Sequence, residues 1–311
     1  MLFHDFIYNP DSTLLPGYRI SPFRTQDIAL NHDLSSSDEI DSYFKIRFPA
    51  QKFIYTKSGR CAISIAVREL RLHKEDVITI FTTSGNSYIS GCVTREIEKY
   101  CKWSRKMESK TRAIFVNHEF GFCYDNLEAL KQYGIPIIED CAHSFLSDNS
   151  ERTTARVGDF TIFSFPKFFP IQCGGGLLCK PEIDIKTEVN VNIVDYIKKV
   201  LSFYIYQVEE ISSRRLENYR FLTDLFNSIN LPVRFEITSE SVPGVFIFKD
   251  KKNLIDLRAL KTFLWSQGIE CSVFYGEPAF YLPVHHRLTK VDLEFFFEAI
   301  RFFLSEMENR N

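Results

Sequence analysis

The sequence contains eight cysteines, but no two of them stand in a Cys-x-x-Cys arrangement. Structural zinc sites usually take closely spaced cysteines, so we expect no bound metal ion. The cysteines are scattered over a chain of 311 residues, which fits reduced thiols in a cytoplasm better than a disulfide framework. They lie at positions 61, 92, 101, 123, 141, 173, 179 and 271.

Other missing features exclude further classes of protein. No window approaches the roughly 18 uninterrupted apolar residues of a membrane span. The stretch Met1–Pro10 has no basic flank followed by a sustained apolar run, which makes it a poor signal peptide. The net charge of −2 gives no electrostatic reason to expect nucleic acid or an anionic membrane as a partner. A Gly-x-Gly-x-x-Gly motif after an early strand is also missing, which disfavours an ordinary dinucleotide-binding protein.

The remaining composition is that of a soluble globular protein. Hydrophobic residues make up 45% of the chain and charged residues 25%. The 30 phenylalanines indicate a core rich in aromatic packing. The length is enough for one large domain or two moderate ones.

Short apolar segments alternate with helical patterns over the first part of the chain. We expect a parallel sheet with helices on both faces, an α/β fold whose ligand lies beyond the carboxyl ends of the strands. The expected strands are 53–56, 77–81, 113–117, 135–139, 160–165 and 177–180, and the expected helices are 38–46, 61–72, 86–100 and 126–133.

The pattern changes after Lys180, where we expect a smaller C-terminal α+β domain. A long helical stretch at 184–226 precedes strands at 245–248 and 271–275, and helices at 254–267 and 290–307. We therefore place a domain boundary near residue 182. Residues 1–182 form an N-terminal arm and a large ligand-binding domain, and residues 183–311 form the small domain.

Asp140 and Lys167 are the strongest candidates for catalytic residues. Asp140 closes one apolar strand, and Lys167 lies just past another, 27 residues later. Pyridoxal 5′-phosphate (PLP) requires such a pair, because a lysine bonds its aldehyde and a carboxylate keeps its pyridine nitrogen protonated. Each residue also has a simpler interpretation. Asp140 could cap a helix beginning near Ala142, and Lys167 could be an exposed loop lysine whose stem covers apolar neighbours.

A phosphate site is expected where Ser58-Gly-Arg-Cys61 opens a helix directly after a strand. Exposed amide groups, the helix dipole and the serine hydroxyl favour an anion there, and Arg60 could add a charge. The run Gly174-Gly-Gly176 would permit close approach of the backbone to a ligand or a tight entry into a strand. His143, three residues after Asp140, could touch the cofactor or be a half-buried structural histidine. His118 is a weaker candidate.

These segments, taken in order, resemble the DegT/DnrJ/EryC1/StrS family of PLP-dependent sugar aminotransferases. Ser58-Gly-Arg-Cys-Ala62 is similar to the family's Ser-Gly-Thr-Ala-Ala phosphate loop, and Ile138-Glu-Asp-Cys-Ala-His143 to its Ile-Glu-Asp-x-Ala-His/Gln block. Phe163-Ser-Phe165, Lys167 and Gly174-Gly175 follow in the family's order, and Gly174-Gly175 lie seven and eight residues after Lys167, as in the family. The resemblance covers about 43–180, and the C-terminal part is a looser match.

The resemblance implies a fold-type I architecture, a homodimer with active sites at the subunit interface, and amino transfer to a keto-sugar nucleotide with glutamate as donor. The product would be an amino sugar for a surface polysaccharide or related glycan. Lys167 would bond the cofactor and shuttle a proton, Asp140 would pair with the pyridine nitrogen, and His143 would lie close to the ring. Ser164, Gly59 and Arg60 would hold the phosphate.

Several departures from the family's pattern leave a second hypothesis open, a non-catalytic member with a binding or regulatory role. Ser84 stands where the family usually has an aromatic residue that stacks on the ring, and Arg60 replaces a threonine. Only two residues separate Ser164 from Lys167, and the family's Asn-x-Arg-Met segment is not found after Lys180. Retention of Asp140 and Lys167 favours the active enzyme. A dehydratase relative usually carries histidine in place of the lysine.

Overall fold

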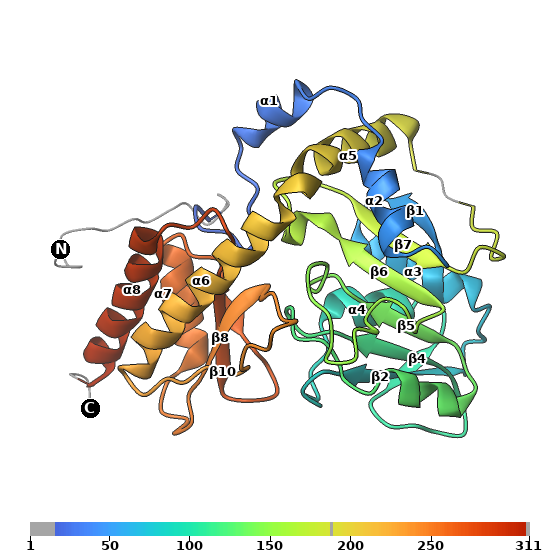
Figure 1. The fold of residues 1–311 in the computed structure, drawn as a ribbon. Helices are drawn as coiled ribbons and strands as arrows, with labels where there is room; N and C mark the ends of the chain where they lie inside the picture. The colour runs from blue at the N-terminus through green and yellow to red at the C-terminus, as the bar shows by residue number, and fades with distance from the viewer. Residues whose placement is uncertain (1–15, 187–188, 309–311) are drawn as a thin grey trace. The chain divides into compact units, whose positions relative to one another are not determined.

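The computed structural model describes residues 16–186 and 189–308, which form two compact units (Figure 1). The large unit comprises residues 23–209 and 239–242. The small unit comprises 210–238 and 243–308 together with 16–22. The domain boundary near residue 182 stays a prediction. The segment Met1–Pro10 lies outside the described residues.

A seven-stranded, mostly parallel sheet forms the centre of the large unit, which confirms the α/β fold expected from the sequence. All six expected strands are present, and both ends of each lie within two residues of the expected positions. The short β3 was not expected. The strand order across the sheet is β1 (Lys52–Thr56), β7 (Gly175–Cys179), β6 (Phe160–Ser164), β5 (Ile137–Asp140), β4 (Thr111–Asn117), β2 (Val77–Thr82) and β3 (Lys102–Ser104).

Strand β7 runs antiparallel to both of its neighbours, β6 and β1. A parallel neighbour would need a crossover of about a dozen residues or more, whereas residues 165–174 connect β6 directly to the start of β7. The chain therefore turns back at once. The carboxyl ends of the other strands consequently share one edge of the sheet with the amino end of β7.

Helices α3 (Gly59–Glu69) and α4 (Gly91–Ile97) cover one face of this sheet (Figure 1). Side chains of β4 alternate between the two faces, as strand geometry requires. Ala113 and Phe115 belong to the buried cluster with α3 and α4. Ile114 and Val116 belong to a second cluster with the segment that follows β4.

A cluster of phenylalanine rings connects helix α2 (Glu39–Arg47) with strands β1 and β6 of the sheet. Phe44 of α2 stacks on Phe53 of β1 with ring centroids 3.7 Å apart, and it also contacts Phe163 of β6. The abundance of phenylalanine in the sequence thus corresponds to aromatic packing directly behind β1 and β6. Helix α1 (Asp27–His32) and helix α5 (Val191–Tyr204) complete the large unit.

The small unit contains an antiparallel sheet of three strands, ordered β8 (Val245–Lys249), β10 (Ala279–Pro283) and β9 (Ser272–Val273). Helices α6 (Val208–Asn227), α7 (Leu257–Ser266) and α8 (Lys290–Glu308) accompany it. Strand β10 was not expected from the sequence, because Ala-Phe-Tyr-Leu-Pro has no clear alternation of apolar and polar residues.

Three expected helices differ from the structure. The segment 126–133 forms a 3-10 helix at Glu128–Tyr133, ended by Gly134 in the left-handed conformation. The expected helix at 86–100 is shorter in the structure, where only α4 (Gly91–Ile97) is helical. It begins after Ser90, whose side chain accepts a hydrogen bond from the Cys92 amide as the N-cap. The stretch 184–226 splits into α5 and α6, separated by a 3-10 turn at Ile205–Gln207.

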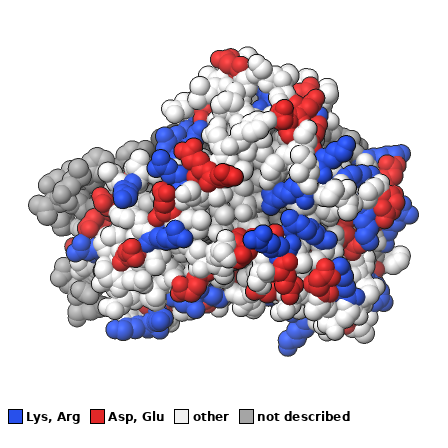
Figure 2. All heavy atoms as spheres, viewed as in Figure 1, with Lys and Arg blue, Asp and Glu red and all other residues white. Residues whose placement is uncertain are grey.

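Charged side chains of both signs mix on the surface, and the cysteines are unpaired. Lysine and arginine are interspersed with aspartate and glutamate over the face in view, without a patch of one sign (Figure 2). All eight cysteines are free thiols. Within 16–186 and 189–308, no helix has the length and apolar character that crossing a membrane requires.

Candidate active site

The shared edge of the large sheet brings the expected site residues together. Asp140 at the end of β5 pairs with Asn117 at the end of β4. Thr56 at the end of β1 and Ser164 at the end of β6 both pair with Gly175. The sheet therefore places three groups at the same edge: the Ser58–Cys61 loop after β1, Lys167 after β6 and Asp140 at the end of β5.

Asp140 is 95% removed from solvent, with 5% of its surface exposed. Burial raises the pKa of its carboxyl to about 6, while a hydrogen bond from the Ala142 amide and, more weakly, the charge of Lys167 act in the opposite direction. The amide of Ala142 donates to Oδ1 over 3.0 Å. Residues 141–150 form turns and no helix, so the interpretation of Asp140 as a helix cap is wrong.

Lys167 ends a short 3-10 helix, Phe165–Lys167, directly after β6. The lysine is half-buried, and Phe168 and Phe169 next to it are fully buried. Its charge offsets a small part of the rise that burial causes in the pKa of the Asp140 carboxyl. Lys167 is therefore not the solvated loop lysine of the simpler interpretation.

The Ser58–Gly59 turn forms a narrow cradle at the amino end of α3. Ser58 is the N-cap of this helix, and its hydroxyl accepts a hydrogen bond from the Cys61 amide over 3.3 Å. A Cβ atom on Gly59 would lie 3.1 Å from Cβ of Ser164. A Cβ atom on Gly175 would lie 2.7 Å from the Gly59 nitrogen. Glycine is thus required at position 175, and Ser58, Gly59 and Ser164 meet at one point.

The other two members of the expected phosphate loop lie on the first turn of α3. Arg60 is exposed, so its guanidinium is available to an anion at the helix end. Cys61 is half-buried, and its sulfur accepts a hydrogen bond from the Ser58 hydroxyl over 3.3 Å.

His143 lies on the turn after Asp140 and is half-buried. Its ring contacts the ring of Phe120 in an edge-on arrangement, with centroids 4.9 Å apart and planes inclined by 60°. Phe120 follows β4 by three residues and was not identified from the sequence. Gly121, a residue type favoured in tight turns, was the signal that could have located the turn that carries it.

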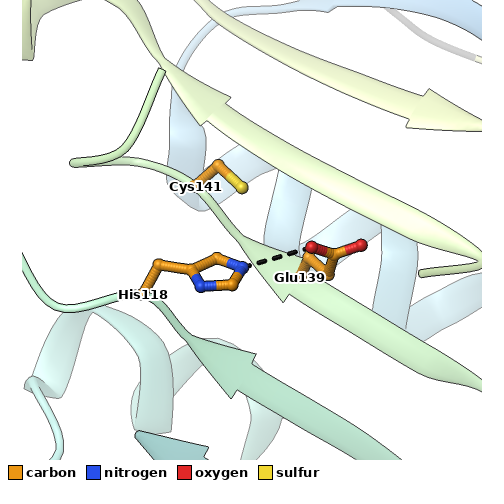
Figure 3. A group of neighbouring side chains, drawn as sticks. All are labelled: His118, Glu139 and Cys141. Atoms are coloured by element: carbon orange, nitrogen blue, oxygen red, sulfur yellow. Dashed lines mark hydrogen bonds and ion pairs between the residues drawn. The ribbon is translucent and has the colours of Figure 1, made fainter. Parts of the chain in front are cut away.

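His118, Glu139 and Cys141 form a buried cluster next to Asp140 (Figure 3). Nε2 of His118 lies 3.2 Å from the Glu139 carboxylate, and Nδ1 accepts a hydrogen bond from the Tyr124 amide over 3.0 Å. With Nδ1 an acceptor, the ring is neutral and donates its Nε2 proton to Glu139.

The Glu139 carboxylate is also committed to the backbone. It accepts hydrogen bonds from the amides of Ala155, Val157 and Gly158 at 2.7–3.1 Å. Burial raises the pKa of the Cys141 thiol well above its ordinary value, so the thiol stays protonated. The cluster therefore has the donor types of a metal site but acts as a hydrogen-bonded clamp that fixes the end of β5.

Ser84 lies in the loop after β2 and is bound to the loop after β4. Its amide donates to the Glu119 carboxylate over 2.7 Å. The neighbouring Thr83 hydroxyl accepts from the Glu119 amide over 3.0 Å and donates to the carbonyl of Phe122 over 2.6 Å. Ser84 is thus part of a polar connection between the two loops.

A protein-family model described as "putative PLP-dependent aminotransferase" matches residues 40–246 of this chain. A search of the curated proteins found no match. Solved structures with similar folds include one described as a putative sugar aminotransferase of Streptococcus pneumoniae in its PMP form, at a TM-score of 0.70 and 15% identity over 96% of this chain and 100% of that one.

Two further structures have similar folds. A DegT/DnrJ/EryC1/StrS aminotransferase from Brucella abortus matches at a TM-score of 0.63 and 14% identity, over 89% of this chain and 93% of that one. The GDP-4-keto-6-deoxy-D-mannose-3-dehydratase of E. coli with bound hydrated PLP matches at a TM-score of 0.67 and 15% identity, over 92% of this chain and 100% of that one. At this level of identity the likeness establishes the fold.

Proposed function

Because the chain belongs to the PLP-dependent aminotransferase family whose model it matches over 40–246, we propose that it transfers an amino group from glutamate to a keto-sugar nucleotide. The product would be an amino sugar for a surface polysaccharide or related glycan. The observation that carries the proposal is the meeting of Lys167 and Asp140 at one sheet edge, close enough for the charge of the lysine to offset a small part of the rise in the carboxyl pKa that burial causes.

The residues at this edge fit the cofactor. PLP, when bound, supplies an electron-accepting ring and an aldehyde. We assign its phosphate to Ser58, Gly59, Arg60, Cys61 and Ser164. Glycine at 59 and 175 keeps the cradle free of side chains, and the amino end of α3 favours an anion through its unpaired amides and its dipole.

Asp140 is suited to hold a cation. Its buried carboxyl has a pKa of about 6, and a protonated pyridine nitrogen beside it would lower this pKa and keep the carboxylate ionised. Lys167 would carry a proton at Nζ to and from the reacting carbon, as the proposed general base. His143, on the turn after Asp140, would lie close to the ring.

The sugar substrate is supported by the neighbours in fold. Two of them are described as a sugar aminotransferase and a DegT/DnrJ/EryC1/StrS aminotransferase, which fits the motif resemblance of residues 43–180. The fold is shared with a dehydratase, so the fold alone does not choose the reaction. Lys167 favours amino transfer, because histidine usually stands there in dehydratase relatives.

A non-catalytic binding or regulatory role is the second candidate. Ser84 favours it, because a polar residue takes the place of a stacking aromatic and is engaged with Glu119. Asp140 disfavours it. A buried carboxylate whose desolvation raises its pKa is a cost to folding that a purely structural protein has no reason to keep.

We further propose that the protein is a cytoplasmic homodimer. Apolar side chains on α1 and α5, two helices that contact each other, are exposed in the single chain. Ile28 and Leu30 of α1 are 50% and 56% exposed, and Phe203 of α5 is 49% exposed. A second copy would remove this surface from water.

The experiment that tests the function needs no knowledge of the sugar. Purified protein is mixed with PLP, and its visible absorption is followed before and after glutamate is added. We expect a band of lysine-bound PLP that glutamate converts to the spectrum of the amine form. Lys167→Ala should abolish the band, and Lys180→Ala, at the opposite end of β7, should retain it. Absence of the band at saturating PLP would refute the enzyme, and a band unaffected by glutamate would favour the non-catalytic role.

A further inference from the structure

We propose that Phe120, together with His143, supplies the aromatic contact for the PLP ring that Ser84 cannot make. This inference rests on the proposed function. It assigns a contact role to a residue outside the motifs that the sequence identified. Three features of the loop after β4 support it: its backbone conformation, its anchoring and the partner of its ring.

The backbone at Phe120 adopts a conformation that bulky side chains rarely take. Phe120 has φ of 53° and Gly121 has φ of 96°, and the Phe122 amide donates to the Glu119 carbonyl over 2.9 Å. Positive φ at both central residues is the mark of a type I′ turn. Glycine, asparagine or aspartate normally occupies its first central position, so a phenylalanine there is strained.

The surrounding contacts hold the turn in this strained form. Thr83 binds both ends of the turn, through the Glu119 amide and the Phe122 carbonyl. The Tyr124 amide donates to His118 Nδ1 just beyond it. All of these bonds involve the backbone or other side chains, so the Phe120 ring contributes to none of them. The ring is half-buried and rests on His143.

The contact between Phe120 and His143 spans two segments that meet at Asp140. The His118 amide donates to the Asp140 carbonyl over 3.2 Å, and Phe120 and His143 follow these two residues by two and three positions. The aromatic pair therefore belongs to the same small region as the buried carboxylate. A flat heteroaromatic ring gains from contact with aromatic side chains, and an apolar neighbour also excludes water from the charged partner of Asp140.

The experiment compares PLP binding by the full-length wild type, Phe120→Gly and Phe120→Tyr. Glycine removes the ring and suits the left-handed backbone, whereas tyrosine keeps the ring. We expect the Kd for PLP to rise about tenfold in Phe120→Gly, in keeping with the loss of an aromatic contact, and to stay within about twofold of wild type in Phe120→Tyr. Phe120→Asn, which also tolerates positive φ, repeats the test with a second backbone-compatible residue.

Inorganic phosphate as a competitor of PLP separates a ring contact from a general loss of structure. Its inhibition constant should be unchanged in Phe120→Gly, because the cradle at Ser58 lies on β1 and α3. Equal PLP affinities for Phe120→Gly and Phe120→Tyr would overturn the inference, as would a matching loss of phosphate affinity. A wild type that binds no PLP would instead overturn the proposed function, and the inference with it.

Discussion

The ring of Phe145, five residues after Asp140, packs edge-on against the ring of Phe165, two residues before Lys167. Their centroids are 6.0 Å apart and their planes are inclined by 85°. Phe145 also contacts Phe163, Phe168 and Phe169. All of these rings are buried, so the turn that carries the carboxylate and the turn that carries the lysine are joined through one aromatic cluster. This packing fixes the spacing of the two proposed catalytic groups.

Phe145→Ala should therefore lower both stability and cofactor binding. Removal of a buried phenylalanine ring costs about 3–5 kcal/mol of unfolding free energy, and the cavity would loosen the connection between Asp140 and Lys167. Denaturant unfolding and PLP titration measure the two effects. Val291→Ala, at a 72% exposed position on α8, is the control and should change stability by less than about 0.5 kcal/mol. Full PLP affinity in a clearly destabilised Phe145→Ala would show that the cluster does not position the site.

Asp140→Asn should stabilise the protein without cofactor while impairing its chemistry. Burial raises the folded pKa of Asp140 to about 6 from an ordinary 3.8, so the folded state binds more protons than the unfolded state between these values. The stability contributed by this group is thus full below pH 3.8 and falls as the pH rises to about 6. Above that, the ionised carboxylate costs up to about 3 kcal/mol.

The gain from Asp140→Asn should appear at pH 8 and vanish below pH 4, as measured by thermal or urea unfolding at the two pH values. With PLP the variant should still show the absorption band of lysine-bound cofactor, but glutamate should convert it far more slowly, because asparagine cannot hold the ring nitrogen protonated. Wild-type turnover in this variant would refute the role of Asp140. If Asp140→Asn is less stable than wild type at pH 8, burial of the ionised Asp140 carboxylate does not destabilise the protein.

Gly175→Ala should disrupt the phosphate cradle. A Cβ atom at this position would lie 2.7 Å from the Gly59 nitrogen, so the start of β7 and the Ser58–Gly59 turn would have to separate. Overpacking of this kind typically costs about 1–3 kcal/mol, and we expect PLP affinity to fall at least tenfold. Gly17→Ala, where an added Cβ meets nothing within 4 Å, is the control. Unaltered PLP binding by Gly175→Ala would place the phosphate elsewhere.

The sequence could suggest most residues of the proposed site because their signals are local. Asp140, Lys167 and Ser58 each follow an apolar strand, and the carboxyl ends of parallel strands share one edge. The strands themselves were found from short apolar runs, which a buried parallel sheet requires. The structure corrected the helix interpretation of Asp140, because the turn after it is held by a side-chain bond to Ala142 and leads into no helix.

The residues that the sequence did not reveal act through distant partners. Glu139 is satisfied by amides of a loop 16–19 residues away and by His118. Phe120 is significant because of a left-handed backbone and a ring that meets His143. The sequence around each of these residues has no distinctive motif. The hydrogen-bond donors of a buried carboxylate and the neighbours of a ring come from distant segments, so spacing along the chain does not reveal them.

The sequence by itself determined the order of the strands along the chain, the segments that leave their ends, and the residue types able to hold a phosphate, a ring nitrogen and an aldehyde. These depend on periodicity and residue chemistry, which are local properties. Only the tertiary structure decided that β7 reverses direction, that phenylalanines from separate segments join the aspartate and lysine turns, and that Glu139 is a clamp. Those outcomes depend on packing and on hydrogen bonds between segments far apart in sequence, where the free energy of burial is shared among many partners.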